Sequence, residues 1–326
     1  MIFKLILFST LFFISCANND APGYSSKDLR RALSIPEYKR PLESKIDRRW
    51  IERDVVFENV SFNGRIGERI NGLVSYSLLA EVQSAPALML MSGSMQNKED
   101  FYNNLNLLRD WADEGFFLIS IDRPSVFGPN APDPNDILRG WGRPVYDLIR
   151  TLDYINERSQ ARSENIGILG ISLGSMEALW LAALDDRIDA VVSISGHLVW
   201  PYVFQSGNWQ RIFSGLSFSR NLVKNGVTNE EAMKLFYEKY HEIEIVDASN
   251  VIEMRKPFHL YVMAGKGDPF NSEKSAKVLY NSALRSFDNT PYCIDSKIYD
   301  GAGHNVVKEM QQDALKWFKE IFFYHN

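Results

Sequence analysis

The sequence predicts an α/β fold in which helices flank a mostly parallel sheet. Short apolar runs typical of buried strands alternate with longer segments whose apolar residues have helical spacing. The runs at 87–91, 116–121 and 166–171 are almost entirely apolar, as expected for strands that are covered on both faces. A stretch rich in aromatic residues interrupts this alternation at about 197–251, and it indicates a cap inserted into the domain.

The composition is that of a globular protein and argues against several other classes. Of the 326 residues, 45% are hydrophobic and 24% are charged, which suits one α/β domain with an insertion. The net charge of −5 gives no support for a nucleic-acid partner. Cysteine occurs only at Cys16 and Cys293, and the five histidines are scattered without metal-ligand spacing. We therefore expect neither a metal nor an organic cofactor.

The N-terminal segment has the pattern of an export signal. Lys4 precedes an apolar run at 5–14 that is too short to span a bilayer. The run ends in Phe13-Ile14-Ser15-Cys16, which resembles the lipobox of bacterial lipoproteins, although that motif usually has Leu, Val or Ile where Phe13 stands. The resemblance implies a signal peptide over 1–15, lipidation of Cys16 and an extracytoplasmic, membrane-tethered location in the bacterial cell envelope. An ordinary secretory signal with a chance cysteine is the alternative.

Residues 16–50 are polar and contain several prolines, without a sustained apolar period. We therefore expect a tether between the anchor and a folded domain over 51–326. Within the tether, residues 27–49 carry eight Lys/Arg against four Asp/Glu, a balance that favours contact with anionic lipid headgroups. A solvated linker explains the same composition.

The remaining elements are expected in a regular order. Strands are predicted at 54–62, 70–79, 87–91, 116–121, 166–171, 190–194, 258–264 and 293–299, and helices at 101–111, 145–155, after 172, at 228–241, 272–284 and 305–323. The first two strands have no helix between them, so we expect them to form an antiparallel edge. Residues 122–144 read as a proline-rich loop, and the capping-box pattern Thr228-x-x-Glu231 marks the start of the cap helix.

The strand predicted at 166–171 leads directly into a candidate nucleophile. Gly170, Ser172 and Gly174 form a G-x-S-x-G motif between a buried strand and a helix, which is the context of a nucleophile elbow. A tight turn exposes the serine hydroxyl to a base, and glycines without Cβ atoms let strand and helix pass close together. A glycine-rich turn without catalytic function has the same five-residue pattern, so the partners of Ser172 decide between the two.

A serine nucleophile needs a base and an orienting carboxylate. His304 lies in a glycine loop directly after the last predicted strand, and Asp268 directly follows the strand before it. Both positions are at the carboxyl edge of a parallel sheet, where such folds build their sites. His197 remains a second candidate for the base. The order Ser172, Asp268, His304 is the order given for α/β-hydrolases.

Two other carboxylates compete with Asp268 for the acid. Asp300 and Asp122 also follow predicted strands, and a structural role in capping loop N–H groups is the alternative for either. The charged residues Lys266 and Arg123 lie near the expected site and are able to meet an anionic group, or to stand as solvated loop charges.

With these residues in place, the chain resembles the α/β-hydrolase superfamily over about residues 54–326. The segment at about 154–196, around GILGISLGSMEA, resembles the acetyl xylan esterase and dienelactone hydrolase-like branch. The resemblance implies an oxyanion hole formed by the backbone N–H groups of Ser94 and Leu173, with Ser92-Gly93-Ser94 replacing the family's His-Gly-x.

The function expected on this basis is hydrolysis of carboxylic esters through an acyl-enzyme on Ser172. The branch resemblance implies acetylated carbohydrate or short-chain acyl esters as substrates. Thioester, peptide and lactone hydrolysis use the same triad, and an acyltransferase or a non-catalytic binding lipoprotein on this fold also stays open.

Overall fold

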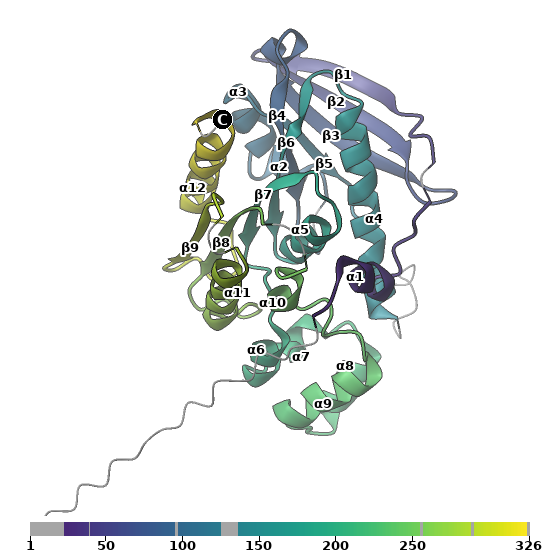
Figure 1. Cartoon of the computed structure of the whole chain (residues 1–326), viewed down its shortest axis with the longest axis vertical. Coiled ribbons are helices and arrows are strands. Elements are labelled where there is room, and N and C mark those ends of the chain that lie inside the picture. The colour runs from purple at the N-terminus through teal and green to yellow at the C-terminus, as the bar shows by residue number, and fades with distance from the viewer. Residues whose placement is uncertain are drawn as a thin grey trace, which may run out of the picture.

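The computed structural model describes residues 23–38, 40–94, 97–124, 136–254, 257–287 and 290–324. Its strands are β1 (Lys45–Glu52), β2 (Val55–Asn63), β3 (Arg69–Ser77), β4 (Ala85–Met91), β5 (Phe117–Ile121), β6 (Ala161–Ile171), β7 (Ile188–Ile194), β8 (His259–Gly265) and β9 (Ile294–Tyr299). They form one sheet in the order β1-β2-β3-β5-β4-β6-β7-β8-β9 (Figure 1). The first three strands are antiparallel, and β3 joins them to a parallel series that begins at β5. The prediction of a mostly parallel sheet is confirmed.

Helices cover both faces of this sheet. One face carries α1 (Ser26–Ala32), α4 (Ile137–Asn156), α5 (Leu173–Leu184), α10 (Ala248–Val251) and α11 (Glu273–Ser286), and the other carries α2 (Asp100–Asn103), α3 (Leu107–Asp113) and α12 (Lys308–Lys319). Successive strand residues alternate between the two layers: Met89 and Ile168 pack on the first, and Leu88 and Leu169 on the second. Strands that are buried on both faces explain the continuous apolar runs of the sequence.

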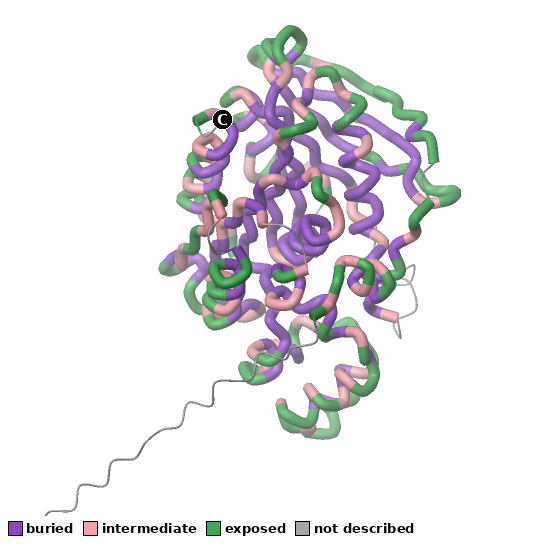
Figure 2. Tube along the Cα trace, in the orientation of Figure 1, coloured by how far each residue is buried: buried purple, intermediate pink, exposed green. Residues whose placement is uncertain are grey.

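The expected tether is wrong for the described part of residues 23–50. There α1 begins at a capping box on Ser25 and buries Leu29 completely, and β1 pairs along its length with β2. Most of β1 is exposed at the edge of the sheet, as Figure 2 shows, so its sequence lacks a regular apolar alternation. Tertiary pairing therefore forms this strand where the local pattern is weak. The predicted signal at 1–15 and Cys16 lie outside the described residues.

Two helices also differ from the prediction. α4 begins at Ile137, inside the expected proline-rich loop, and continues through Pro144. The helix expected at 101–111 is divided into α2 and α3 because Asn106, between them, has a left-handed φ of 56°. Among the described residues, no helix is long and apolar enough to cross a membrane.

The cap comprises α6 (Trp200–Gln205), α7 (Trp209–Ile212), α8 (Ser217–Lys224) and α9 (Asn229–Lys239), grouped at the lower end of Figure 1. Its aromatic rings pack on one another, with Phe213 and Phe236 centroids 4.7 Å apart. Trp200 stacks on Trp141 of α4 at 5.9 Å, which joins the cap to the domain. The buried aromatic residues thus form the core of the cap and its contact with the rest of the domain.

Candidate active site

Ser172 occupies a strained turn between β6 and α5. Its φ of 54° and ψ of −122° lie in a sparsely populated region for a residue with a Cβ atom. The surrounding backbone holds it there: the Ser172 N–H donates to the Ile194 carbonyl at 2.8 Å. The Ser175 Oγ lies 2.6 Å from the Gly170 carbonyl and 2.8 Å from that of Ile194. Ser175 directly follows the elbow motif and is not among the site residues predicted from the sequence.

Close backbone contacts explain the elbow glycines. A Cβ on Gly170 would lie 2.5 Å from the Gly174 carbonyl oxygen, so the end of β6 and the first turn of α5 leave no room for a side chain. A Cβ on Gly174 would lie 2.5 Å from the Met91 carbonyl oxygen and 2.7 Å from that of Ser92. The start of α5 therefore packs directly on the end of β4.

Ser172, His304 and Asp268 form a hydrogen-bonded row. The Ser172 Oγ lies 3.0 Å from His304 Nε2, and His304 Nδ1 lies 2.8 Å from Asp268 Oδ2. A close approach of two loops makes the row possible, because a Cβ on Gly265 would lie only 2.0 Å from the Gly303 carbonyl oxygen. The structure thus brings the three predicted residues together from the ends of β6, β8 and β9.

The Asp268 carboxylate is held on both oxygens. Its side chain is fully buried, and Oδ1 accepts the N–H groups of Phe270 at 2.8 Å and Asn271 at 3.0 Å. The other oxygen is left for His304, whose ring also packs on Phe270 at a centroid distance of 4.7 Å. An ionised carboxylate only accepts hydrogen bonds, so Nδ1–H of His304 donates to it and Nε2 is free to accept the Ser172 hydroxyl.

His197, the second candidate for the base, does not contact Ser172 in any hydrogen bond of the described residues. It is fully buried, with Nε2 2.9 Å from Asn271 Nδ2 and Nδ1 3.2 Å from Ser193 Oγ. Burial lowers its pKa to about 3, so the ring is neutral at physiological pH. Because Asn271 also donates its backbone N–H to Asp268, His197 supports the loop that holds Asp268.

The competing carboxylates have other partners. Asp300 is 85% exposed and pairs with Lys266 at 3.0 Å. Asp122 pairs with Lys98 at 2.6 Å. Neither lies in the row with Ser172 among the described contacts, and the described residues contain no cluster of three or more His, Cys, Asp or Glu side chains suited to a metal ion.

The two expected oxyanion donors lie on adjacent segments. Leu173 is the first residue of α5, and the first N–H groups of a helix have no acceptor within it. Ser94 follows β4, whose end is in backbone contact with Gly174. The dipole of α5 adds a partial positive charge at this point. The two segments therefore meet at the start of α5, directly after Ser172, and the role of their N–H groups stays a prediction.

An ion pair that was not predicted from the sequence joins Arg123, after β5, to Glu177 of α5. Arg123, expected as a loop charge, is only 7% exposed in its side chain and pairs with Glu177 of α5, which is fully buried. Burial raises the pKa of Glu177 to about 7, against the opposing effect of the Arg123 charge. The signal was present in the sequence, since Glu177 is the one charged residue of an otherwise apolar and small-residue helix segment.

Comparisons with known proteins agree with this architecture. Residues 150–308 match the family model described as BAAT / Acyl-CoA thioester hydrolase C terminal, a range that contains Ser172, Asp268 and His304. The putative hydrolase YtaP of Bacillus subtilis (strain 168) is 37% identical over 71 residues, which are 22% of this chain and 24% of that relative.

Solved structures match over most of the chain. Acetyl xylan esterase 1 from Thermoanaerobacterium sp. JW/SL YS485 has a TM-score of 0.68 at 18% identity, covering 91% of this chain and 93% of that one. The acetyl xylan esterase from Paenibacillus sp. R4 has a TM-score of 0.67 at 16% identity, covering 90% and 92%. With the sheet order and the elbow described above, these matches show that the chain has an α/β-hydrolase fold.

Proposed function

We propose that this protein is a serine hydrolase of carboxylic esters. The observation that carries the proposal is the row from Ser172 Oγ to His304 Nε2 at 3.0 Å and from His304 Nδ1 to Asp268 at 2.8 Å. The first distance allows proton transfer from the nucleophile to its base, and the second is that of the hydrogen bond by which the acid orients the base.

The geometry gives each residue a role. His304 Nε2 takes the hydroxyl proton as Ser172 Oγ attacks the acyl carbon, and Asp268 stabilises the resulting imidazolium. The oxyanion of the tetrahedral intermediate accepts the N–H groups of Leu173 and Ser94. When the intermediate collapses, His304 gives the proton to the leaving alcohol. A water molecule, activated by the same histidine, then releases the acid from the acyl-enzyme.

Short-chain acyl esters, including acetylated carbohydrates, are the proposed substrates. The support is the similarity in fold to two acetyl xylan esterases. Thioester hydrolysis is the second candidate, because the description of the family model that matches 150–308 includes acyl-CoA thioester hydrolase. An acyltransferase would use the same acyl-enzyme with an alcohol or amine acceptor in place of water.

The test is active-site labelling with a fluorophosphonate, followed by mapping of the modified peptide, on protein without residues 1–15. We expect labelling at Ser172 that is lost in Ser172→Ala and His304→Ala, together with turnover of 4-nitrophenyl acetate. Comparison of kcat/KM for acetyl esters and acetyl thioesters, with and without an added alcohol acceptor, separates the three activities. Absence of both label and turnover in folded protein would favour a binding role and refute the proposal.

We further propose that Cys16 is lipidated and tethers the protein to the bacterial cell envelope. The support is the sequence alone: an apolar run at 5–14 that ends at Cys16 in a lipobox-like motif. Radiolabelled palmitate should be incorporated into the full chain and not into Cys16→Ala. Equal labelling of both proteins would contradict the anchor.

A further inference from the structure

We infer that Arg123 and Glu177 are positioning residues, which hold the loop carrying one oxyanion donor against the helix carrying the other. This loop, named here the oxyanion loop, follows β4 and is described at 92–94 and 97–99. The inference rests on the proposed function, since it assigns the two residues to the geometry of the oxyanion hole.

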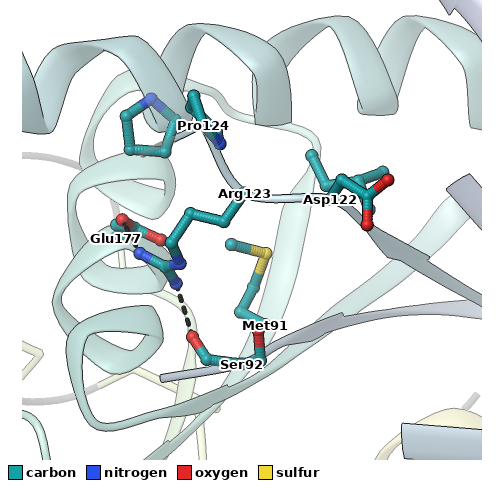
Figure 3. Close-up of a pocket in the computed structure, with 8 residues that line it drawn as sticks. Met91, Ser92, Asp122, Arg123, Pro124 and Glu177 are labelled. Carbon is teal, nitrogen blue, oxygen red and sulfur yellow. Dashed lines mark hydrogen bonds and ion pairs between the residues drawn. The ribbon is translucent and has the colours of Figure 1, made fainter. Parts of the chain in front are cut away.

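The Arg123 guanidinium bridges two segments that are distant in sequence. In Figure 3 its side chain extends from the end of β5 toward α5, and a dashed line joins it to Ser92. One terminal nitrogen, Nη1, pairs with Oε1 of Glu177, and the other, Nη2, donates to the carbonyl of Ser92. Glu177 stands five positions after Ser172 on α5, and the Ser92 carbonyl is two residues before the Ser94 N–H.

The shape of the guanidinium makes this bridge directional. Its N–H groups form a rigid planar fork, so the position of the Ser92 carbonyl is fixed relative to the Glu177 carboxylate. Leu173 and Glu177 belong to the same helix, and Ser92 and Ser94 to the same short loop. The bridge therefore sets the separation between the two oxyanion donors. A lysine, which is a point charge on a flexible stem, would not hold both contacts in one geometry.

The other side of the oxyanion loop is held by the preceding residue. Asp122 accepts from Lys98 Nζ at 2.6 Å, and Lys98 also pairs with Glu99 at 3.0 Å. Consecutive residues at the end of β5 thus hold the loop at Ser92 and at Lys98.

We expect no direct contact between this pair and the substrate. Arg123 is 7% exposed and Glu177 is fully buried, and the cavity beside them measures about 10 Å³. That volume is at the lower limit for one water molecule, so no acyl or alcohol group of a substrate enters it. Arg123 and Glu177 act through the backbone they hold.

The energetics of the pair also indicate a positional role. Burying two charges costs more than their attraction returns unless all their polar atoms are satisfied. Among the described residues, Arg123 Nε and Glu177 Oε2 have no hydrogen-bond partner. An apolar pair of similar volume would be expected to stabilise this position as well or better. Stability alone therefore gives no reason for an ion pair at this place.

The experiment measures kcat and KM for 4-nitrophenyl acetate, the rate of fluorophosphonate labelling and the midpoint of thermal unfolding. The variants are Arg123→Lys, Glu177→Gln and the apolar double variant Arg123→Met/Glu177→Leu. Glu58→Gln is the matched control, because Glu58 is also a buried carboxylate, ion-paired with Arg158 at 2.7 Å, but lies on β2. Rates are expressed per folded molecule.

We expect each variant at the Arg123 pair to lower kcat and the labelling rate about 10- to 100-fold with KM changed less than about threefold, because a misplaced oxyanion donor affects the transition state selectively. The double variant should match or exceed the thermal midpoint of the wild type and still be slow. Glu58→Gln should lower the midpoint and keep its kcat.

Two results would overturn the inference. Wild-type kcat in the double variant would show that the bridge does not set the oxyanion geometry. A loss of kcat in Glu58→Gln equal to that in Glu177→Gln would show a general effect of removing a buried carboxylate. In both cases the wild-type protein still turns over ester and labels at Ser172. Failure of the wild type itself to do either refutes the proposed function, and this inference with it.

Discussion

Replacement of Gly174 by alanine tests the link between the elbow and the oxyanion loop. The added Cβ would lie 2.5 Å from the Met91 carbonyl oxygen and 2.7 Å from that of Ser92, whereas real Cβ atoms essentially never approach closer than 3.0 Å. The start of α5 and the end of β4 must therefore separate by at least 0.5 Å at the closer contact. Both neighbours are backbone atoms, so no side-chain rotation relieves the clash.

We expect this separation to affect catalysis more than substrate binding. It moves the N–H of Leu173 away from that of Ser94, and a misplacement of about 1 Å in an active site lowers the rate by about 100-fold. A shift of half that size should lower kcat about 10-fold or more, with little change in KM. The same clash should lower the free energy of unfolding by about 1–3 kcal/mol. Steady-state kinetics and urea denaturation measure the two effects.

Gly167→Ala serves as the control because its added Cβ also presses on β4, but at a different place from that of Gly174→Ala. Its Cβ would lie 2.7 Å from Leu88 Cδ2, in the core and away from the oxyanion loop. We expect a loss of stability with kcat per folded molecule unchanged. If Gly174→Ala kept the kcat of the wild type while losing stability, the separation of the two segments would be irrelevant to the rate, and the assignment of Leu173 and Ser94 would be wrong.

Three further predictions concern buried polar groups. Asp268→Asn should lower kcat by about 10⁴-fold, because an amide facing His304 Nδ1 favours the wrong tautomer; a wild-type pH–rate profile in this variant would contradict the role of the acid. His197→Gln should lower kcat about 10-fold by loosening Asn271 and should keep fluorophosphonate labelling, and complete loss of labelling would instead identify His197 as the base. Burial raises the pKa of Asp247 to about 6, above its value in the unfolded chain, so its contribution to stability is lost as pH rises from about 4 to 6. Urea denaturation should therefore show a smaller decline over this interval in Asp247→Asn than in the wild type, and equal slopes would refute the shift.

The parts of the fold that the sequence predicts best are those with strong local patterns. The strands β4 to β8 carry apolar runs, and the structure places each within a few residues of the predicted range. The helix α1 was missed because it buries only Leu29 and Ala32. The strand β1 was missed because none of its residues is buried, and it is held by pairing with the strand that follows it. Pro144 likewise suggested a loop, although α4 accommodates it without ending.

The residues of the candidate site also differ in how well the sequence predicts them. The elbow and the positions of Asp268 and His304 follow from motif and strand order, which are local or topological signals. The Arg123–Glu177 pair joins a loop to a helix more than fifty positions away, and the local sequence of neither segment predicts which residue is its partner. Only the folded chain shows which buried charge faces which.

The order of the sheet explains why the site lies at Ser172. The connections that follow the neighbouring strands β4 and β6 lead in opposite directions. After β4 the chain continues to β5 on one side, and after β6 it continues to β7 on the other side. In open α/β sheets, the crevice outside the carboxyl ends of two such strands is where ligands bind. Ser94 follows β4 and Ser172 follows β6, which places both at this crevice. Arg123, at the end of β5, contacts both Ser92 after β4 and Glu177 of α5, which follows β6. The bridge therefore lies where β4 and β6 are neighbours and their connections lead in opposite directions. A residue that ties these segments together there controls the geometry of the crevice itself, which is why we expect its loss to appear in kcat before it appears in stability.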